Sequence, residues 1–265
     1  MGGRSGLWAL AALVGLLLAG CGSERPDSAQ APSAAGSAPA VGGTVTVFAA
    51  ASLTEPFTEL GRRFEAAHPG ATVRFGFGGS STLATQITQG APADVFASAS
   101  ERTMATVVDS GLAADPRPFA RNTMTIVVPP DNPAKIGGLA DLARPGVKVA
   151  LCQQQVPCGT LAAKILSDAG LAVTPATYGA DVRAVLTTVG LGEVDAGLVY
   201  VTDALAAAGE VASIEIPAAQ NASTSYPIAA LSKAPNPAGA EAFVQFVLSD
   251  TGRAVLDRAG FSPPA

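Results

Sequence analysis

The chain has 265 residues, a formal net charge of −5 and only 14% charged residues, and 48% of its residues are hydrophobic. An acidic balance without a basic cluster argues against a nucleic-acid partner. The length allows one large domain or two small ones. The composition therefore favours a compact α/β protein.

The N-terminus has the features of an export signal. Arg4 precedes an apolar run over 7–19, which is too short to span a bilayer, and small residues follow it up to Cys21. The ending Leu-Ala-Gly-Cys resembles the lipobox of bacterial lipoproteins, whose cysteine becomes the lipidated first residue of the mature protein. We expect a lipoprotein signal peptide over 1–21 and lipidation of Cys21. The alternative is an ordinary signal peptide with an incidental cysteine.

Residues 22–43 contain mostly Ser, Ala, Pro and Gly and little that could be buried. Such a segment is typical of a flexible tether. The folded body then begins near residue 44. An anchor, a tether and a body together predict a protein held at the outer face of the cytoplasmic membrane, on its periplasmic or extracellular side.

The body begins with an apolar strand that ends at Ser52, where helical spacing begins with Phe57, Leu60 and Phe64. Ser52 and Glu55 match the spacing of a capping box, which predicts that Ser52 caps this helix. The first amides of a helix lack intrahelical partners, and the helix dipole adds partial positive charge there. A strand followed by a hydroxyl residue and a helix is therefore a potential anion site.

The same order of strand, turn and helix recurs along the chain. Expected strands are 72–78, 94–97, 123–129, 147–152, 196–201, 211–216 and 224–231, and expected helices begin near 82, 100, 158, 180 and 202, with a last helix over 237–248. Alternating strands and helices predict parallel sheets covered by helices on both faces. Ligands of such sheets bind beyond the carboxyl ends of the strands, where these turns lie.

The remaining cysteines, Cys152 and Cys158, lie in an exported chain, where a disulfide is the default expectation. Their spacing excludes a CxxC redox motif. A bridge across so short a loop would contribute only about 2 kcal/mol, and its main effect would be to stiffen 153–157. With a single histidine, His68, and a disulfide, the sequence offers no zinc-binding constellation.

Five motifs occur in an order that resembles the periplasmic molybdate-binding proteins of bacterial ABC importers, and the resemblance covers residues 44–261. They are Phe-Ala-Ala-Ala-Ser-Leu at 48–53, Gly-Ser-Ser-Thr-Leu-Ala-Thr-Gln-Ile at 79–87, Gly-Ala-Pro-Ala-Asp-Val-Phe at 90–96, Val-Pro at 156–157 and Gly-Leu-Val-Tyr at 197–200. The resemblance implies an α/β, two-lobed type II periplasmic-binding-protein fold, with mixed sheets flanked by helices and a two-strand hinge.

The resemblance also implies where the lobes divide. Lobe 1 would comprise 44–123 and 226–265, and lobe 2 would comprise 124–225. The hinge strands would be 123–128 and the segment before Ile228.

The same resemblance implies a set of oxyanion donors. Ser52 and Ser80 would donate their hydroxyls, Cys158 and Val182 their backbone amides, and Tyr200 its phenol. Ser81 is adjacent to Ser80, so the choice between these two serines stays open. Cys158 stands where family members usually have alanine, which an amide donor tolerates, although a disulfide then shapes the loop.

This donor set suits a tetrahedral dianion, which offers only acceptors, so that every partner must donate. Helix dipoles can supply the electrostatics without Lys or Arg. Neutral donors also avoid a buried formal charge in the empty site. No metal beyond the molybdate oxyanion and no cofactor is expected.

We therefore expect a monomeric substrate-binding protein that captures molybdate, and tungstate as well, and delivers it to an ABC permease. It would not be an enzyme, because the expected distance of His68 from the serine turns leaves no activated nucleophile. The main alternative is a sulfate- or phosphate-binding protein of the same fold. A ferric-iron binder is less consistent with the sequence, since Tyr178, Tyr200 and Tyr226 are scattered along it, and a purely structural lipoprotein would have no oxyanion affinity.

Overall fold

A computed structural model describes residues 41–264, which belong to one compact unit of the chain. The expected signal peptide, the lipidation site at Cys21 and residues 22–40 of the expected tether lie outside the described residues. Within 41–264, no helix combines the length and the apolar character that crossing a membrane requires.

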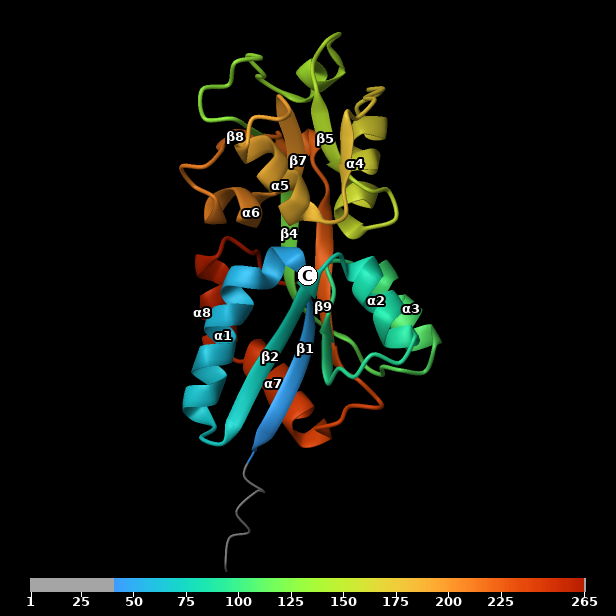
Figure 1. Cartoon of the computed structure of the whole chain (residues 1–265), viewed down its shortest axis with the longest axis vertical. Coiled ribbons are helices and arrows are strands. Elements are labelled where there is room, and N and C mark those ends of the chain that lie inside the picture. Colours follow the sequence, from blue (N-terminus) through green and yellow to red (C-terminus); the bar gives the residue numbers. More distant parts are fainter. Residues whose placement is uncertain (1–40, 265) are drawn as a thin grey trace, which may run out of the picture. The chain divides into compact units, whose positions relative to one another are not determined.

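Four strands form the first part of the sheet, in the order β2-β1-β3-β9. β1 is parallel to β2 and β3, whereas β9 is antiparallel to β3. Together with the helices on either side in Figure 1, they make up what we call the first lobe. Its elements are β1 (Gly43–Ala50), α1 (Thr54–Ala67), β2 (Ala71–Gly78), α2 (Ser80–Thr88), β3 (Val95–Ala97), α3 (Glu101–Asp109), β9 (Ser223–Ala230), α7 (Pro237–Leu248) and α8 (Asp250–Arg258).

The second lobe is built on strands β7, β5 and β6, in that order, and on β8. β5 is parallel to both β6 and β7. The elements of this lobe are β5 (Val149–Cys152), α4 (Pro157–Asp168), β6 (Thr177–Gly179), α5 (Val182–Gly190), β7 (Ala196–Tyr200), α6 (Val201–Ala206) and β8 (Ala212–Glu215).

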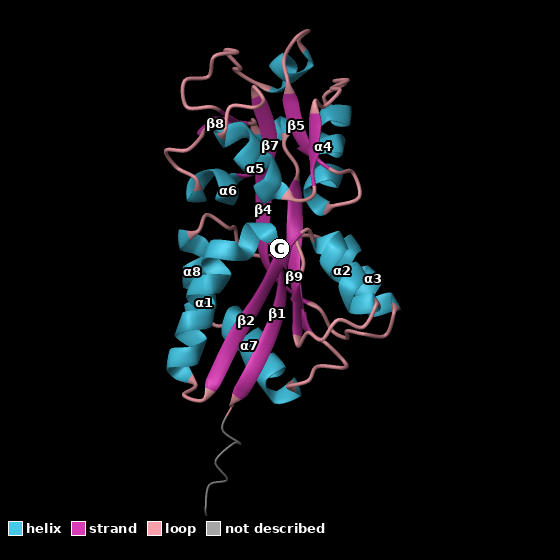
Figure 2. Cartoon of the chain, in the orientation of Figure 1, coloured by secondary structure: helices cyan, strands magenta, loops and turns pink. Residues whose placement is uncertain are grey.

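Strand β4 (Arg117–Val128) takes part in both lobes, as Figure 2 shows. Its residues 117–123 pair with β9, and its residues 124–128 pair with β7 and β8. All of these pairings are antiparallel, so the sheet is mixed, as the resemblance implies, and the parallel sheets that local alternation predicts are only part of it. Local alternation of strands and helices does not reveal a long strand that changes partners halfway along.

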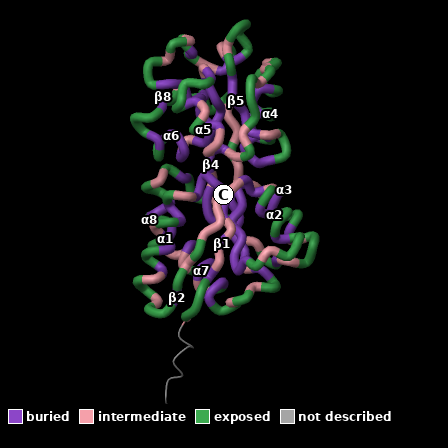
Figure 3. The backbone as a smooth tube through the Cα atoms, in the orientation of Figure 1, coloured by how far each residue is buried: buried purple, intermediate pink, exposed green. Residues whose placement is uncertain are grey.

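Buried residues run through both lobes and along the strands that join them (Figure 3). On α1, Phe57, Leu60 and Phe64 are fully buried, as their helical spacing predicts. Phe57 and Phe64 also contact Phe243 of α7, with ring centroids 6.1 and 5.3 Å apart. Each such side chain contributes about 1.5–3 kcal/mol on burial, so α1 is held firmly beneath the strand that leads into it.

Two elements were not predicted. The chain continues beyond 248 into α8, because the Ser249 hydroxyl accepts a bond from the Gly252 amide and starts a new helix. β6 has only three residues, too few for a periodic signal.

Candidate functional site

A small cavity lies between the lobes, where strand ends and helix N-termini meet. Its volume is only about 10 Å³. All five residues that the sequence analysis proposed as oxyanion donors line this cavity. The full lining is Ala50, Ala51, Ser52, Gly78, Gly79, Ser80, Ala99, Val156, Pro157, Cys158, Asp181, Val182 and Tyr200.

Ser52 lies in a short 3-10 turn, Ala51–Leu53, between β1 and α1. The prediction that it caps α1 is wrong, because α1 begins at Thr54 and its cap position, Leu53, makes no side-chain cap bond. The extra turn directs the buried Ser52 hydroxyl toward the hinge, where its Oγ lies 2.9 Å from the Tyr226 hydroxyl oxygen. The main-chain turn, rather than the helix itself, therefore presents Ser52 to the cavity.

Ser80 is the first residue of α2 and is 1% exposed. Its Oγ accepts a hydrogen bond of 3.0 Å from the Ala99 amide, which leaves its own proton free for another acceptor. The neighbouring Ser81 instead donates its hydroxyl to the Gln155 carbonyl, at 2.7 Å. Ser80, and not Ser81, lines the cavity.

Cys158 lies in the first turn of α4, which begins at Pro157 and has no side-chain cap. Its sulfur is bonded to that of Cys152, at 2.07 Å. The intervening loop folds back on the helix so closely that a Cβ on Gly159 would lie 2.0 Å from the Gln153 carbonyl oxygen. Only glycine can occupy such a position. The bridge and this close contact together shape the cavity wall.

Val182 is the first residue of α5, and Asp181 caps that helix. The Asp181 carboxylate accepts from the amides of Arg183 and Ala184, at 2.9 and 3.0 Å. The amide of Val182 is not among those that the cap satisfies. It remains available to a ligand in the cavity that Val182 lines.

Tyr200 ends β7 and is 1% exposed, and its hydroxyl has no hydrogen-bond partner within residues 41–264. Burial, followed by the neighbouring Tyr226 and Asp203, raises the pKa of this phenol well above its ordinary value. Tyr200 is therefore a protonated donor at any physiological pH. Tyr200 also occupies the cap position of α6, close to the helix start that the sequence predicts near 202, and its amide donates to Asp203 at 3.2 Å.

The cavity wall carries no formal positive charge, yet its electrostatics suit an anion. No Lys or Arg lines it, and its one acidic residue, Asp181, is engaged in capping α5. The N-termini of α2, α4 and α5 supply partial positive charge and amides that lack intrahelical partners. The arrangement can hold a small, fully accepting anion.

The described residues contain no group of three His, Cys, Asp or Glu side chains suited to a metal ion. His68 follows the C-terminal end of α1, the end opposite the cavity. Tyr200 and Tyr226 are less scattered than the sequence suggested, because their ring centroids lie 5.9 Å apart. Tyr178 is half exposed and does not line the cavity.

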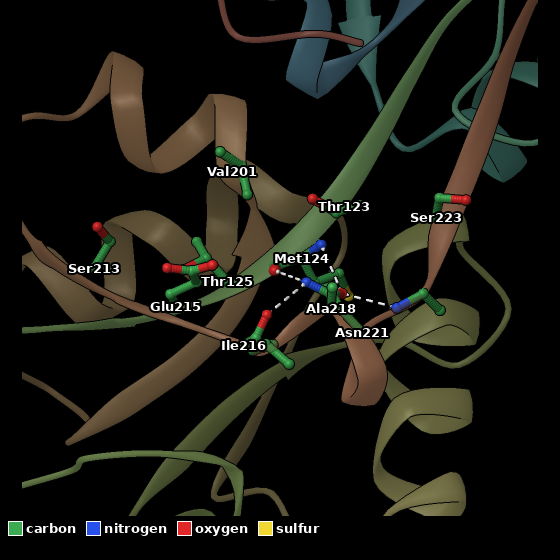
Figure 4. A pocket seen from close by; sticks show the side chains of 11 residues that line it. Thr123, Met124, Thr125, Val201, Ser213, Glu215, Ile216, Ala218, Asn221 and Ser223 are labelled. Atoms are coloured by element: carbon green, nitrogen blue, oxygen red, sulfur yellow. Dashed lines mark hydrogen bonds between the residues drawn. The ribbon is translucent and has the colours of Figure 1, made fainter.

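A second hollow of about 730 Å³ opens beside β4 and β8 (Figure 4). The side-chain amide of Asn221, which lines this hollow, is already hydrogen-bonded within the protein. Its Nδ2 donates to the Met124 carbonyl at 2.7 Å, and its Oδ1 accepts from the Ala222 amide at 2.8 Å. Glu215 adds a carboxylate, which repels anions. The larger hollow is therefore a poorer anion site than the small cavity.

Contacts between the lobes surround the small cavity. Ser81 reaches Gln155 as described, Arg102 of α3 donates to Thr160 of α4 at 2.8 Å, and Glu55 of α1 pairs with Arg183 of α5 at 2.7 Å. Two lobes joined by shared strands and closed over one cavity define a solute-binding protein of the two-lobed type.

Comparison with known proteins agrees with this class. Residues 45–262 match the model of the bacterial extracellular solute-binding protein family, and the chain belongs to that family. The molybdate-binding protein ModA of Mycobacterium tuberculosis is 45% identical over 93% of each chain.

Two solved structures share the fold. The periplasmic molybdate-binding protein of Azotobacter vinelandii has a TM-score of 0.74 at 21% identity, and the alignment covers 83% of this chain and all of that one. The sulfate-binding protein SubI of Mycobacterium tuberculosis has a TM-score of 0.74 at 23% identity, over 83% and 86% of the two chains. The expected α/β, type II periplasmic-binding-protein fold is thereby confirmed.

Proposed function

We propose that this solute-binding protein captures molybdate, and tungstate as well, between its lobes and delivers it to an ABC permease. The observation that carries the proposal is the small cavity in which neutral donors from both lobes meet, with the Tyr200 hydroxyl lacking a hydrogen-bond partner among the described residues. The 45% identity to a molybdate-binding protein supports the choice of anion. The oxyanion is cargo, so the protein needs no cofactor and catalyses no reaction.

Each donor has a distinct part in the proposed site. The hydroxyls of Ser52 and Ser80 bind from the first lobe, and the phenol of Tyr200 binds from the second. The amides of Cys158 and Val182 complete the second-lobe side. The proposal favours Ser80 over Ser81, because the Ser81 hydroxyl is engaged with Gln155 outside the cavity lining.

We place the division between the lobes at the point where β4 changes partners, between Thr123 and Met124. Lobe 1 then comprises 44–123 and 226–265, and lobe 2 comprises 124–225. Residues 123–128 and the part of β9 before Ile228 act as the hinge. The bridge between Cys152 and Cys158 forms in the exported protein and keeps the α4 amide in place for the ligand.

The proposed setting is the outer face of the cytoplasmic membrane, with Cys21 lipidated and the monomeric body on a tether. Labelling cells with a radioactive or clickable fatty acid tests the anchor. A Cys21→Ser chain should lose the label and be released from the membrane fraction. Retention of the label by Cys21→Ser would contradict the anchor without affecting the proposed ligand.

The ligand is tested by thermal unfolding of the purified protein with molybdate, tungstate, sulfate or phosphate. Ligand at a thousand times its Kd adds about 4 kcal/mol to the free energy of unfolding. For a body of this size, that corresponds to a shift in Tm on the order of 10 °C. A shift in Tm with sulfate or phosphate alone would mean that the cargo is that anion and not molybdate. The absence of a shift with all four anions would overturn the proposed function.

The site assignment is tested with Ser52→Ala and Ser80→Ala. Each is expected to weaken molybdate binding by about 1–3 kcal/mol, because a charged acceptor loses a donor. Ser81→Ala is the matched control and should leave the affinity nearly unchanged. Calorimetric titrations with equal affinities in all four proteins would remove these serines from the site.

A further inference from the structure

Tyr226 lies in hinge strand β9 and does not line the cavity, yet its hydroxyl is fully buried beside it. The hydroxyl oxygen lies 2.9 Å from Ser52 Oγ, from which it is separated by 174 positions in the chain. Its ring contacts the ring of Tyr200 at 5.9 Å between centroids. Tyr226 is therefore in contact with a proposed donor from each lobe.

Packing holds the Tyr226 ring in a single place. Its ring centroid lies 6.2 Å from that of Phe119 and 5.2 Å from that of Phe261, both in edge-to-face contact. Such aromatic pairs contribute beyond their burial and fix the orientation of the ring. The hydroxyl therefore cannot turn away from Ser52 without disturbing the hinge.

The direction of the bond between the two hydroxyls follows from what the ligand needs. Ser52 has a single proton, and an oxyanion offers only acceptors. If Ser52 donated to Tyr226, it would present only lone pairs to the anion and repel it. Burial raises the pKa of the Tyr226 phenol, so this group keeps its proton and can always donate.

We propose that Tyr226 is a positioning residue that donates its proton to Ser52 Oγ and so commits the Ser52 proton to the bound oxyanion. The inference rests on the proposed function, because it assumes that Ser52 holds the anion. Donation from Tyr226 also polarises the Ser52 hydroxyl, as in other chains of hydrogen bonds. The hinge thereby sets the direction of a bond in the site without touching the ligand.

The experiment is a double-mutant cycle on the full-length chain, with molybdate affinity measured by calorimetry. The proteins are wild type, Tyr226→Phe, Ser52→Ala and the double variant. Tyr226→Phe keeps the ring and its packing and removes one hydrogen bond, so we expect about tenfold weaker binding. In the Ser52→Ala background, the same substitution should cost at most about twofold, because the group through which it acts is gone.

Tyr178→Phe is the matched control, since it removes a hydroxyl from a half-exposed tyrosine outside the cavity lining, and it should leave the affinity unchanged. Unfolding of each protein without ligand separates positioning from stability. A tenfold loss in both backgrounds, or no loss in either, would overturn the proposal. If wild type itself bound no molybdate, the proposed function would fail first.

Tyr226→Met provides a second variant in case Tyr226→Phe does not fold. It also removes the hydroxyl but fills the space with a flexible apolar side chain. It should again weaken binding only where Ser52 is present. An equal loss with and without Ser52 would show that Tyr226 acts through packing alone and would refute the proposal.

Discussion

The two sides of the cavity differ in how their polar groups are satisfied. On the first-lobe side, Ser52 Oγ is bonded to Tyr226 and Ser80 Oγ to the Ala99 amide. The second lobe contains three buried polar side-chain atoms without a partner, the only ones in residues 41–264: Arg183 Nη1, the Tyr200 hydroxyl and Asp203 Oδ1. Of these three residues, only Tyr200 lines the cavity.

This difference indicates where binding free energy is gained. A buried polar group without a partner costs about 1–3 kcal/mol. In the first lobe, the oxygen of each serine hydroxyl already has a partner and its proton stays available, so this side can receive an anion with little rearrangement. In the second lobe, the Tyr200 hydroxyl carries such an unmet cost, which an anion in the cavity would relieve by accepting its proton. We therefore expect the first lobe to act as a prepared surface and the second lobe to supply most of the gain on closure.

The largest expected effect concerns Asp203, on the second-lobe side. Burial, reinforced by Glu55 and Asp181 against the opposing effect of Arg183, raises the pKa of Asp203 from 3.8 to about 8. Because the folded state binds this proton more tightly than the unfolded state, stability should fall as the pH rises from about 4 to 8 and then level off. The total loss should be on the order of a few kcal/mol.

Asp203→Asn should remove most of this pH dependence, because an amide side chain does not titrate. The amide oxygen can still accept from the Tyr200 backbone amide, so the fold should be kept. Denaturant unfolding at pH 5, 6.5 and 8 makes the comparison. Parallel profiles of stability against pH for the two proteins would mean that Asp203 is ionised in the folded protein. The second lobe would then carry a smaller cost of unpartnered buried groups than proposed.

Tyr200→Phe tests the comparison more directly. We expect molybdate affinity to fall about 10- to 100-fold, the equivalent of about 1–3 kcal/mol, because the only phenol facing the cavity is lost. Stability without ligand should rise, since an unsatisfied hydroxyl is replaced by an apolar edge. Calorimetry and unfolding measure the two effects separately. A fall in both quantities would show that the hydroxyl already has a partner in the free protein.

Gly79→Ala probes the closeness of the two sides. A Cβ at Gly79 would lie 2.7 Å from the Ala180 carbonyl oxygen of the second lobe. Overpacking of this kind costs about 1–3 kcal/mol, so affinity should fall about tenfold while the lobes themselves stay folded. Gly138→Ala is the control, because nothing lies within 4 Å of its Cβ. Equal affinities in the two variants would mean that the bound state is more open here.

The smallest effect is expected at the rim. Glu55 and Arg183 join the lobes at 2.7 Å, but their side chains are 46% and 35% exposed. Such pairs contribute at most about 1 kcal/mol, so Glu55→Gln should weaken binding by no more than about fivefold. The loss should shrink as salt is raised, because exposed charges are screened. A larger loss that is insensitive to salt would assign Glu55 a role in the site itself.

Sequence patterns predicted the repeated order of strand, turn and helix well, and the motifs around Ser52, Ser80 and Tyr200 identified residues that share one cavity. The patterns failed where residues with the spacing of a helix cap instead bond to residues distant in the sequence. Ser52 and Glu55 have the spacing of a capping box, but a 3-10 turn intervenes and their side chains bond to Tyr226 and Arg183 instead.

The position of Tyr226 could not have been predicted from sequence. Its place in an apolar strand is visible, but periodicity indicates only which face of a strand a residue occupies. Which groups meet on that face depends on how β9 is paired with β3 and β4, and this pairing joins residues 100 or more positions apart. The short β6 was not predicted, and the residue pattern by itself did not reveal the antiparallel pairing of β4, because strand pairing is a property of the whole fold.

The pairing of Tyr200 with Tyr226 has a practical consequence. The only tryptophan of the chain is Trp8, so the ultraviolet emission of residues 41–264 comes from their tyrosines. Two of those three rings lie at or beside the cavity, and the third, Tyr178, is half exposed. Ligand binding should therefore change the tyrosine fluorescence of the protein, with no tryptophan emission from residues 41–264 to mask it. Occupancy could then be followed in real time without any attached dye.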